Sequence, residues 1–172
     1  MHRITSVLYA MIFGLTLPAT AIALPADRTQ QVEITANSAR FDERAGEAVY
    51  RGNVLVKQGT MEVRGDSLIL NVDDKGALTI ARTLGKPARF QQKVDPNKGL
   101  VKGEANEVIF DNRDSSVTLI GNAVLRQDSA SFSGPRIVYS TTRKQIEASG
   151  NDTERVQLIF PPSIRESSGK AQ

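Results

Sequence analysis

A segment of this chain occurs twice, and this duplication limits the possible folds more than any other feature of the sequence. Residues 32–70 align without a gap with residues 101–139, at a shift of 69 positions, and ten of the 39 aligned pairs are identical. Average residue usage would give roughly two or three identities. The clearest match pairs Gly52-Asn53 with Gly121-Asn122, and apolar residues follow each dipeptide. The repeat predicts one structural unit built twice.

Within each copy, the apolar residues form short runs that are separated by turn-forming residues. In the first copy the runs are 48–50, 54–56 and 68–70, and Gly52-Asn53 and Gly65-Asp66 lie between them. None of these runs is long enough for a helix, and Gly, Asn and Asp favour turns. Short strands that alternate with turns predict an all-β protein, built as a sandwich, a barrel or a stacked ribbon of strands.

The N-terminus predicts a cleaved export signal. Residues 1–3 carry charge, an apolar run covers residues 7–17, and the small residues Ala21 and Ala23 follow. This order is typical of a secretory signal peptide, which we expect to comprise residues 1–23. An uncleaved membrane anchor is the alternative, because the same stretch is long enough to span a bilayer.

The composition after residue 23 argues against several classes of function. The excess of basic over acidic side chains is small, and the basic residues are not interleaved with aromatic ones, so we do not expect nucleic-acid binding. The chain contains no cysteine, and its one histidine is His2. Nucleophilic triads and zinc sites with nitrogen or sulfur ligands are therefore excluded.

Two carboxylate pairs remain as candidates for catalysis or calcium binding. Asp42-Glu43 and Asp73-Asp74 both lie in turn contexts that account for them, and neither has the spacing of a known metal loop. We therefore predict no catalytic residue, no metal and no cofactor. Binding is the stronger hypothesis.

Apolar residues of both copies are candidates for a binding surface. If two repeat sheets face each other, their inward side chains line an elongated apolar slot. The same residue types also fill ordinary protein cores, so a packed interior is the alternative. The candidate slot residues are Val32, Ile34, Phe41, Phe90, Val108 and Phe110.

The strand 32–37, the two Gly-Asn dipeptides and the segment 85–90 resemble, in this order, the LptA family of periplasmic lipopolysaccharide-transport bridge proteins. The resemblance implies a single OstA-like domain over residues 31–162, followed by a flexible tail at 163–172. The implied fold is an all-β, OstA-type β-jellyroll of many short antiparallel strands with a V-shaped section. The resemblance also implies that the protein is not an enzyme. The implied protein binds lipopolysaccharide in the periplasm and shields the lipid A acyl chains in an apolar groove.

The same resemblance implies particular residues and partners. Val32, Ile34, Phe90 and Phe110 match lipid-facing positions of the family, in which Tyr also occurs at the place of Phe110. Because Phe90 is expected on a groove wall, Phe90→Asp is predicted to lose lipid binding without unfolding the protein.

The two edge strands of such a sheet are expected to remain open for partners. The N-terminal edge is expected to meet LptC at the inner membrane, and the C-terminal edge LptD at the outer membrane. Copies of the chain are expected to associate head to tail through the same edges. The edge residues are Val32 and Ile34 on the first strand and Arg155, Val156 and Leu158 near the last.

Three other functions are compatible with these features. The first is a non-catalytic assembly module with a filled core, and the second is a membrane-anchored component similar to LptC. A glycosidase that uses two carboxylates is a distant third.

Overall fold

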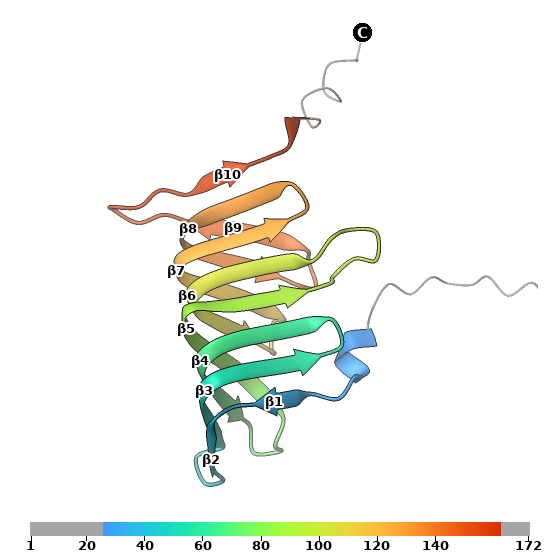
Figure 1. The fold of residues 1–172 in the computed structure, drawn as a ribbon, viewed down its shortest axis with the longest axis vertical. Helices are drawn as coiled ribbons and strands as arrows, with labels where there is room; N and C mark the ends of the chain where they lie inside the picture. The colour runs from blue at the N-terminus through green and yellow to red at the C-terminus, as the bar shows by residue number, and fades with distance from the viewer. Residues whose placement is uncertain (1–25, 163–172) are drawn as a thin grey trace, which may run out of the picture.

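The computed structural model describes residues 26–162, so the predicted signal peptide at 1–23 and the predicted tail at 163–172 lie outside the described residues. Ten strands form one antiparallel sheet, which confirms the all-β fold (Figure 1). The strand order is β1-β3-β4-β5-β6-β7-β8-β10, with β2 on β3 and β9 on β8. The elements are η1 (Ala26–Thr29), β1 (Glu33–Thr35), β2 (Ser38–Asp42), β3 (Glu47–Gln58), β4 (Met61–Val72), β5 (Leu78–Gln92), β6 (Val101–Asp111), β7 (Ser116–Gln127), β8 (Ala130–Ser140), β9 (Gln145–Ser149) and β10 (Gln157–Ile159).

The central strands are longer than the sequence runs suggest, because several expected turns are bulges inside strands. In β3 the pairing with β4 jumps from Arg51 to Val54, yet the strand continues. Gly52 and Asn53 have φ angles of 79° and 49°, in the left-handed region, which explains the local irregularity. A Cβ at position 52 would lie 2.5 Å from Nδ2 of Asn37, so only glycine fits.

The backbone irregularities themselves are duplicated. Positive φ angles occur at Gly46, Gly52, Asn53 and Gly59, and they recur 69 positions later at Ser115, Gly121, Asn122 and Asp128. The duplication predicted from sequence therefore extends to backbone conformations that side chains other than Gly and Asn seldom adopt.

The bulges lie side by side and fold the sheet along a line. The pairing shifts between Arg64 and Ser67 in β4, between Leu84 and Ala88 in β5, and between Glu104 and Glu107 in β6. Each long strand is thereby divided into two arms, and Figure 1 shows strand segments both in front and behind. The first arm comprises 33–35, 54–65, 88–105, 123–134 and 157–159, and the second arm comprises 38–51, 67–84, 107–120 and 136–149.

The inner faces of the two arms contact each other in the second repeat. A Cβ on Gly103, in the first arm, would lie 3.1 Å from Cδ1 of Leu119, in the second arm. Gly103 takes the place that Ile34 has in the first repeat. The smaller residue lets the arms approach more closely there. The second repeat is accordingly well packed, and its buried residues are Ala88, Phe90, Val101, Ala105, Val108, Val117, Leu119, Ala123, Leu125, Ile137 and Tyr139.

The first repeat has a much smaller buried cluster. Among the described residues, this cluster has Val54, Val56 and Leu68 as its buried apolar members, and half-buried apolar residues surround them. The two copies therefore share a backbone pattern and differ in how completely their interiors are filled.

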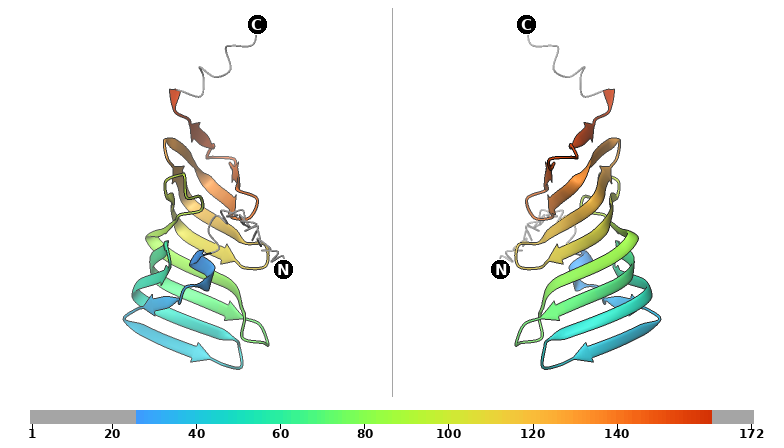
Figure 2. Two further views of the ribbon diagram at one scale, coloured as in Figure 1. Left: turned by 90° about the vertical axis from the view of Figure 1, so that its right-hand side faces the viewer. Right: turned by 90° about the vertical axis from the view of Figure 1, so that its left-hand side faces the viewer.

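The interrupted strands lie at the two edges of the sheet. By the 69-residue shift, the single strand β6 corresponds to β1 and β2, which are separate strands of three and five residues. The strands β4 and β8 are equivalent by the same shift. Because β5 pairs with β4, and β9 and β10 pair with β8, the single strand β5 corresponds to β9 and β10. Figures 1 and 2 show β2 and β10 at opposite ends of the long axis.

Two details of β5 and β10 follow from the bulge and the strand pairing. Pro87 lies inside β5, at its bulge, where a missing amide donor is tolerated. Phe90 pairs with Val63, and Leu158 pairs with the equivalent Phe132. Leu158 is thus the counterpart of Phe90.

Candidate ligand groove

An apolar groove lies between the two arms and is centred on the first repeat. Its volume is about 380 Å³. The first arm contributes side chains from β1, β3, β4 and β5. The second arm contributes side chains from β4, β5, β6, β7 and the turn after β8. The apolar lining consists of Val32, Ile34, Val56, Met61, Val63, Leu68, Leu70, Leu78, Ala81, Phe90, Val94, Val108, Phe110 and Val117.

Five of the six slot residues predicted from the sequence line this groove. Val32, Ile34 and Phe90 lie on or beside the first arm, and Val108 and Phe110 lie on the second. The structure therefore brings together residues that are up to 78 positions apart in the sequence.

Phe41 is the exception, because it does not line the groove. It lies on the edge strand β2 and is 63% exposed, while its counterpart Phe110 is half-buried. The difference has a simple cause. Phe110 pairs with Ala81 of β5, whereas β2 has β3 as its sole partner among the described strands.

Phe90 contributes both to the groove and to the core. It is 4% exposed and belongs to the buried cluster of the second repeat. A carboxylate there would be buried without a partner, at a cost of several kcal/mol. We therefore expect Phe90→Asp to unfold the protein, contrary to the expectation from sequence.

Several lining residues in β4 and β5 were not predicted from the sequence, among them Leu68, Leu70 and Ala81. The alternation of Leu68 and Leu70 around Ile69 was a signal that both face one side of the sheet. The identity of that side depends on the bulge between Arg64 and Ser67, which the sequence does not mark.

One end of the groove mouth is covered by η1. Asp27 is buried and accepts hydrogen bonds from the backbone amide of Thr60, at 2.8 Å, and from Nε2 of Gln92, at 3.3 Å. Nε2 of Gln58 donates to the carbonyl of Gln30 at 3.1 Å. These contacts attach the segment before β1 to the turn between β3 and β4.

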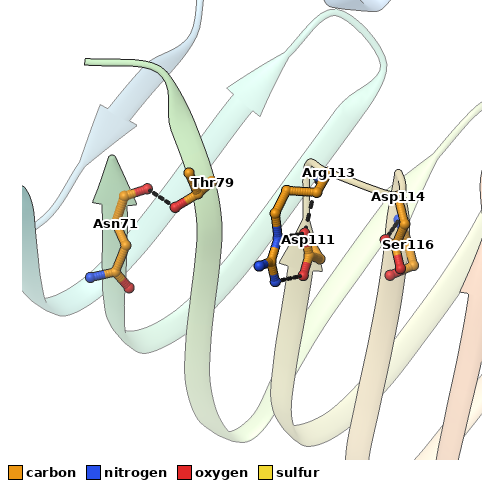
Figure 3. A network of polar contacts seen from close by, with 6 residues as sticks. All are labelled: Asn71, Thr79, Asp111, Arg113, Asp114 and Ser116. Atoms are coloured by element: carbon orange, nitrogen blue, oxygen red, sulfur yellow. Dashed lines mark hydrogen bonds and ion pairs between the residues drawn. The ribbon is translucent and has the colours of Figure 1, made fainter. Parts of the chain in front are cut away.

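The acidic residues at the tips of the second arm form turns and ion pairs. Figure 3 shows Arg113 against Asp111, where Nε of Arg113 donates to Oδ1 at 2.9 Å. This contact lowers the pKa of the Asp111 carboxyl. Asp73 accepts from the amides of Lys75 and Ala77, at 2.9 Å each.

The other carboxylate pair considered from sequence also belongs to a turn. Oδ1 of Asp42 accepts from the amide of Ala45 at 3.1 Å. Within residues 26–162, no three carboxylate, His or Cys side chains cluster as metal ligands would. The arrangement is suited to holding an apolar ligand.

The predicted edge residues are only partly in strands. Ile34 lies in β1 and Leu158 in β10, whereas Val32, Arg155 and Val156 lie outside the strands. Arg155 and Val156 belong to the loop between β9 and β10, in which Oδ1 of Asn151 accepts from the amides of Thr153 and Glu154.

The fold and the groove define a class of protein, a β-jellyroll-like sheet folded around an apolar ligand groove. The model of the family described as "LptA/(LptD N-terminal domain) LPS transport protein" matches residues 33–145. The chain belongs to this family, as its sequence resemblance suggested.

Curated relatives agree with the family. The chain is 37% identical over 141 residues to the lipopolysaccharide export system protein LptH of Pseudomonas aeruginosa, covering 80% of this chain and 81% of that protein. It is 27% identical over 168 residues to the lipopolysaccharide export system protein LptA of Escherichia coli K12, covering 96% and 89%. Both relatives are named as components of lipopolysaccharide export.

A solved structure supports the same conclusion. The crystal structure of LptH, described as the LptA-homologous periplasmic component of the lipopolysaccharide transport device of Pseudomonas aeruginosa, superposes with a TM-score of 0.74 at 31% identity. The match covers 80% of this chain and all of that one. Between residues 26 and 162, the structure has no helix of the length and hydrophobicity required to cross a membrane.

Proposed function

We propose that this protein binds lipopolysaccharide in the periplasm, with the lipid A acyl chains in the groove and the sugars outside. The observation that carries the proposal is the apolar groove of about 380 Å³ between the arms, in a chain of the lipopolysaccharide transport family. Each methylene moved from water to an apolar environment gains about 0.8 kcal/mol. A groove of this kind therefore lets a lipid with several chains cross an aqueous space.

The test is binding of lipopolysaccharide to the purified chain without residues 1–23, with a plain phospholipid as control. Ile34→Asp places a carboxylate on the groove wall at an edge strand, where the fold tolerates it better than at Phe90. Thr35→Asp is the matched control, because Thr35 is exposed and points to the opposite face of β1. We expect Ile34→Asp to lose binding and Thr35→Asp to retain it. Equal binding by both variants would contradict the proposal.

We also propose that copies of the chain join head to tail through the two sheet edges, to form a bridge between inner and outer membranes. Within the part of the chain that the structure describes, β1 and β2 pair with β3 alone, and β9 and β10 pair with β8 alone. Most of the exposed large apolar residues lie on or beside these edges, namely Val32, Phe41, Val156, Leu158, Ile159 and Phe160. By the family resemblance, the β1/β2 edge faces LptC and the β9/β10 edge faces LptD at the two ends of the bridge.

The internal duplication supplies a register for this contact. β5 and β6 pair within the molecule, and β9/β10 and β1/β2 are their respective counterparts. Ile146 is the counterpart of Ala81, because the two residues pair with the equivalent positions Tyr139 and Leu70. Ala81 pairs with Phe110 inside the chain, and Phe110 is the counterpart of Phe41, so Ile146 of one copy is opposite Phe41 of the next. The solvent-exposed Phe41 would then be covered, as Phe110 is.

The same register places opposite charges together. Arg82 pairs with Ile109 inside the chain, and the equivalent positions are Glu147 on β9 and Arg40 on β2. The Arg40 side chain is highly exposed, and its Nη2 lies 3.7 Å from Oδ2 of Asp42 on the same strand. A cross-strand pair of opposite charges is worth roughly 0.2 to 1 kcal/mol, and like charges in direct opposition destabilise.

A charge exchange tests the register. Arg40→Glu and Glu147→Arg should each weaken self-association, and the double variant should restore it, as measured by analytical ultracentrifugation. Arg89→Glu, on the outer face of the central strand β5, is the control. Weakening that the double variant does not relieve would contradict this register.

A further inference from the structure

Two segments that belong to different arms meet across the mouth of the groove. The loop between β5 and β6 lies at the end of the first arm, and the turn between β8 and β9 lies at the end of the second arm. Nζ of Lys144 lies 3.6 Å from Oδ2 of Asp95. An extended strand of the length of β8 would separate its two ends by about 36 Å, so this contact exists because the sheet is folded.

The Asp95 carboxylate is fixed in position. Its Oδ1 accepts a hydrogen bond from the amide of Asn97 at 2.9 Å. This hydrogen bond and the charge of Lys144 lower the pKa of Asp95, so the group is an anion at neutral pH. Val94, its neighbour, packs against the core of the second repeat and also lines the groove. The Lys144 side chain, by contrast, is 57% exposed.

A second cation lies at the same mouth. Lys93 lines the groove together with Thr141 and Thr142, which adjoin the turn that carries Lys144. Among residues 26–162, no carboxylate lies within 4.0 Å of the Lys93 ammonium group. The carboxylate of Asp27, which also borders the groove, already accepts hydrogen bonds from Thr60 and Gln92.

We propose that Lys93 and Lys144 form a site for the phosphate group of a glycolipid whose acyl chains fill the groove, and that the phosphate replaces Asp95 as the partner of Lys144. This inference rests on the proposed function and identifies the headgroup chemistry that the groove selects. A phosphate monoester carries a charge of about −1.5 to −2 and three acceptor oxygens, against −1 and two for Asp95. The exchange therefore strengthens the interaction of Lys144 and gives Lys93 a counter-ion.

The position of the two lysines explains why the site favours an amphiphile over free phosphate. Acyl chains in the groove hold the headgroup at the mouth, which raises its local concentration near both ammonium groups. Filling the groove also removes water from the mouth, and an ammonium group that loses water without gaining an anion is destabilised. An uncharged headgroup would thus bind less well.

The test measures binding of lipid A to the chain without residues 1–23, with bisphosphorylated and enzymatically dephosphorylated lipid A compared in the same detergent. Lys93→Gln and Lys144→Gln should each weaken binding of the phosphorylated form about tenfold, with no change for the dephosphorylated form. Asp95→Asn removes the competitor and should tighten binding of the phosphorylated form alone. Lys102→Gln, on the outer face of β6, is the control and should change neither.

The outcomes separate this inference from the proposed function. If the native chain binds neither form of lipid A, the proposed function fails. If it binds both forms equally, and the two lysine variants behave as the native chain does, the groove binds lipid but the phosphate site does not exist. Equal binding of phosphatidylglycerol in the same detergent would contradict selectivity for a glycolipid. Circular dichroism of each variant identifies any loss of fold.

Discussion

The unequal filling of the two repeats is tested by two leucine-to-alanine substitutions. Leu119 has no exposed surface and contacts residues of both arms in the second repeat. Leu70 is half-buried and lines the groove in the first repeat. The chemical change is the same at both sites, so any difference in effect reports how the surroundings are packed.

The expected magnitudes differ by a factor of about three. Leu→Ala at a fully packed site costs about 3 to 5 kcal/mol, because a cavity remains. At Leu70 the side chain is partly exposed and faces the open groove, so no enclosed cavity remains and the loss is about 1 kcal/mol. For a domain of this size, each kcal/mol lowers the Tm by about 3 to 4 °C. We expect a decrease of about 10 °C or more for Leu119→Ala and about 4 °C for Leu70→Ala.

The assay is thermal and urea unfolding followed by far-UV circular dichroism, with and without lipopolysaccharide. A ligand at one hundred times its Kd stabilises the native state by about 2.7 kcal/mol. Leu119→Ala should retain this increment, whereas Leu70→Ala should show a smaller one, because it removes part of the groove wall. Equal destabilisation by both substitutions, with equal ligand increments, would refute the reasoning and indicate a filled core throughout.

Three further predictions follow from local contacts. Gly52→Ala should lower the free energy of unfolding by about 1 to 3 kcal/mol in urea titrations, because its Cβ would collide with Asn37 and its φ is positive; an unchanged midpoint would contradict this. Asp27→Ala should release η1, detectable as faster amide exchange at Thr60, whereas unchanged exchange would show that η1 is held by other contacts. Burial raises the pKa of the Tyr139 phenol, so the stabilisation that the buried phenol contributes is complete below pH 10.0 and is lost as the pH rises above that value. Tyr139→Phe should therefore reduce the alkaline loss of stability in urea titrations.

The sequence predicted the fold class and five of the fourteen apolar groove residues, because these depend on local signals that the duplication reinforces. The family resemblance identified Val32 and Ile34. The repeated Gly-Asn dipeptides marked the bulges without revealing that the strands continue through them. Phe41 and Phe110 are identical in sequence, yet one is exposed and the other half-buried. Their difference arises from the neighbouring strand, which is a property of the whole sheet.

The contact between Asp95 and Lys144 at the mouth of the groove could not be predicted from the sequence for a similar reason. Asp95 and Lys144 are 49 positions apart and belong to turns without any special pattern. Their contact depends on the angle between the arms, which aligned bulges in many strands set together. Likewise, the burial of Phe90 follows from the close packing that Gly103 permits, and a single glycine in a strand predicts no such contact.

The eight strands along the main path of the sheet also define a length. Adjacent strands are about 4.8 Å apart, so one copy extends by about 38 Å along the direction in which copies would join. A hydrogen-bonded sheet does not stretch appreciably in this direction. An assembly made of such copies would therefore measure distance in whole steps, and a wider gap between membranes would be spanned by recruiting another copy.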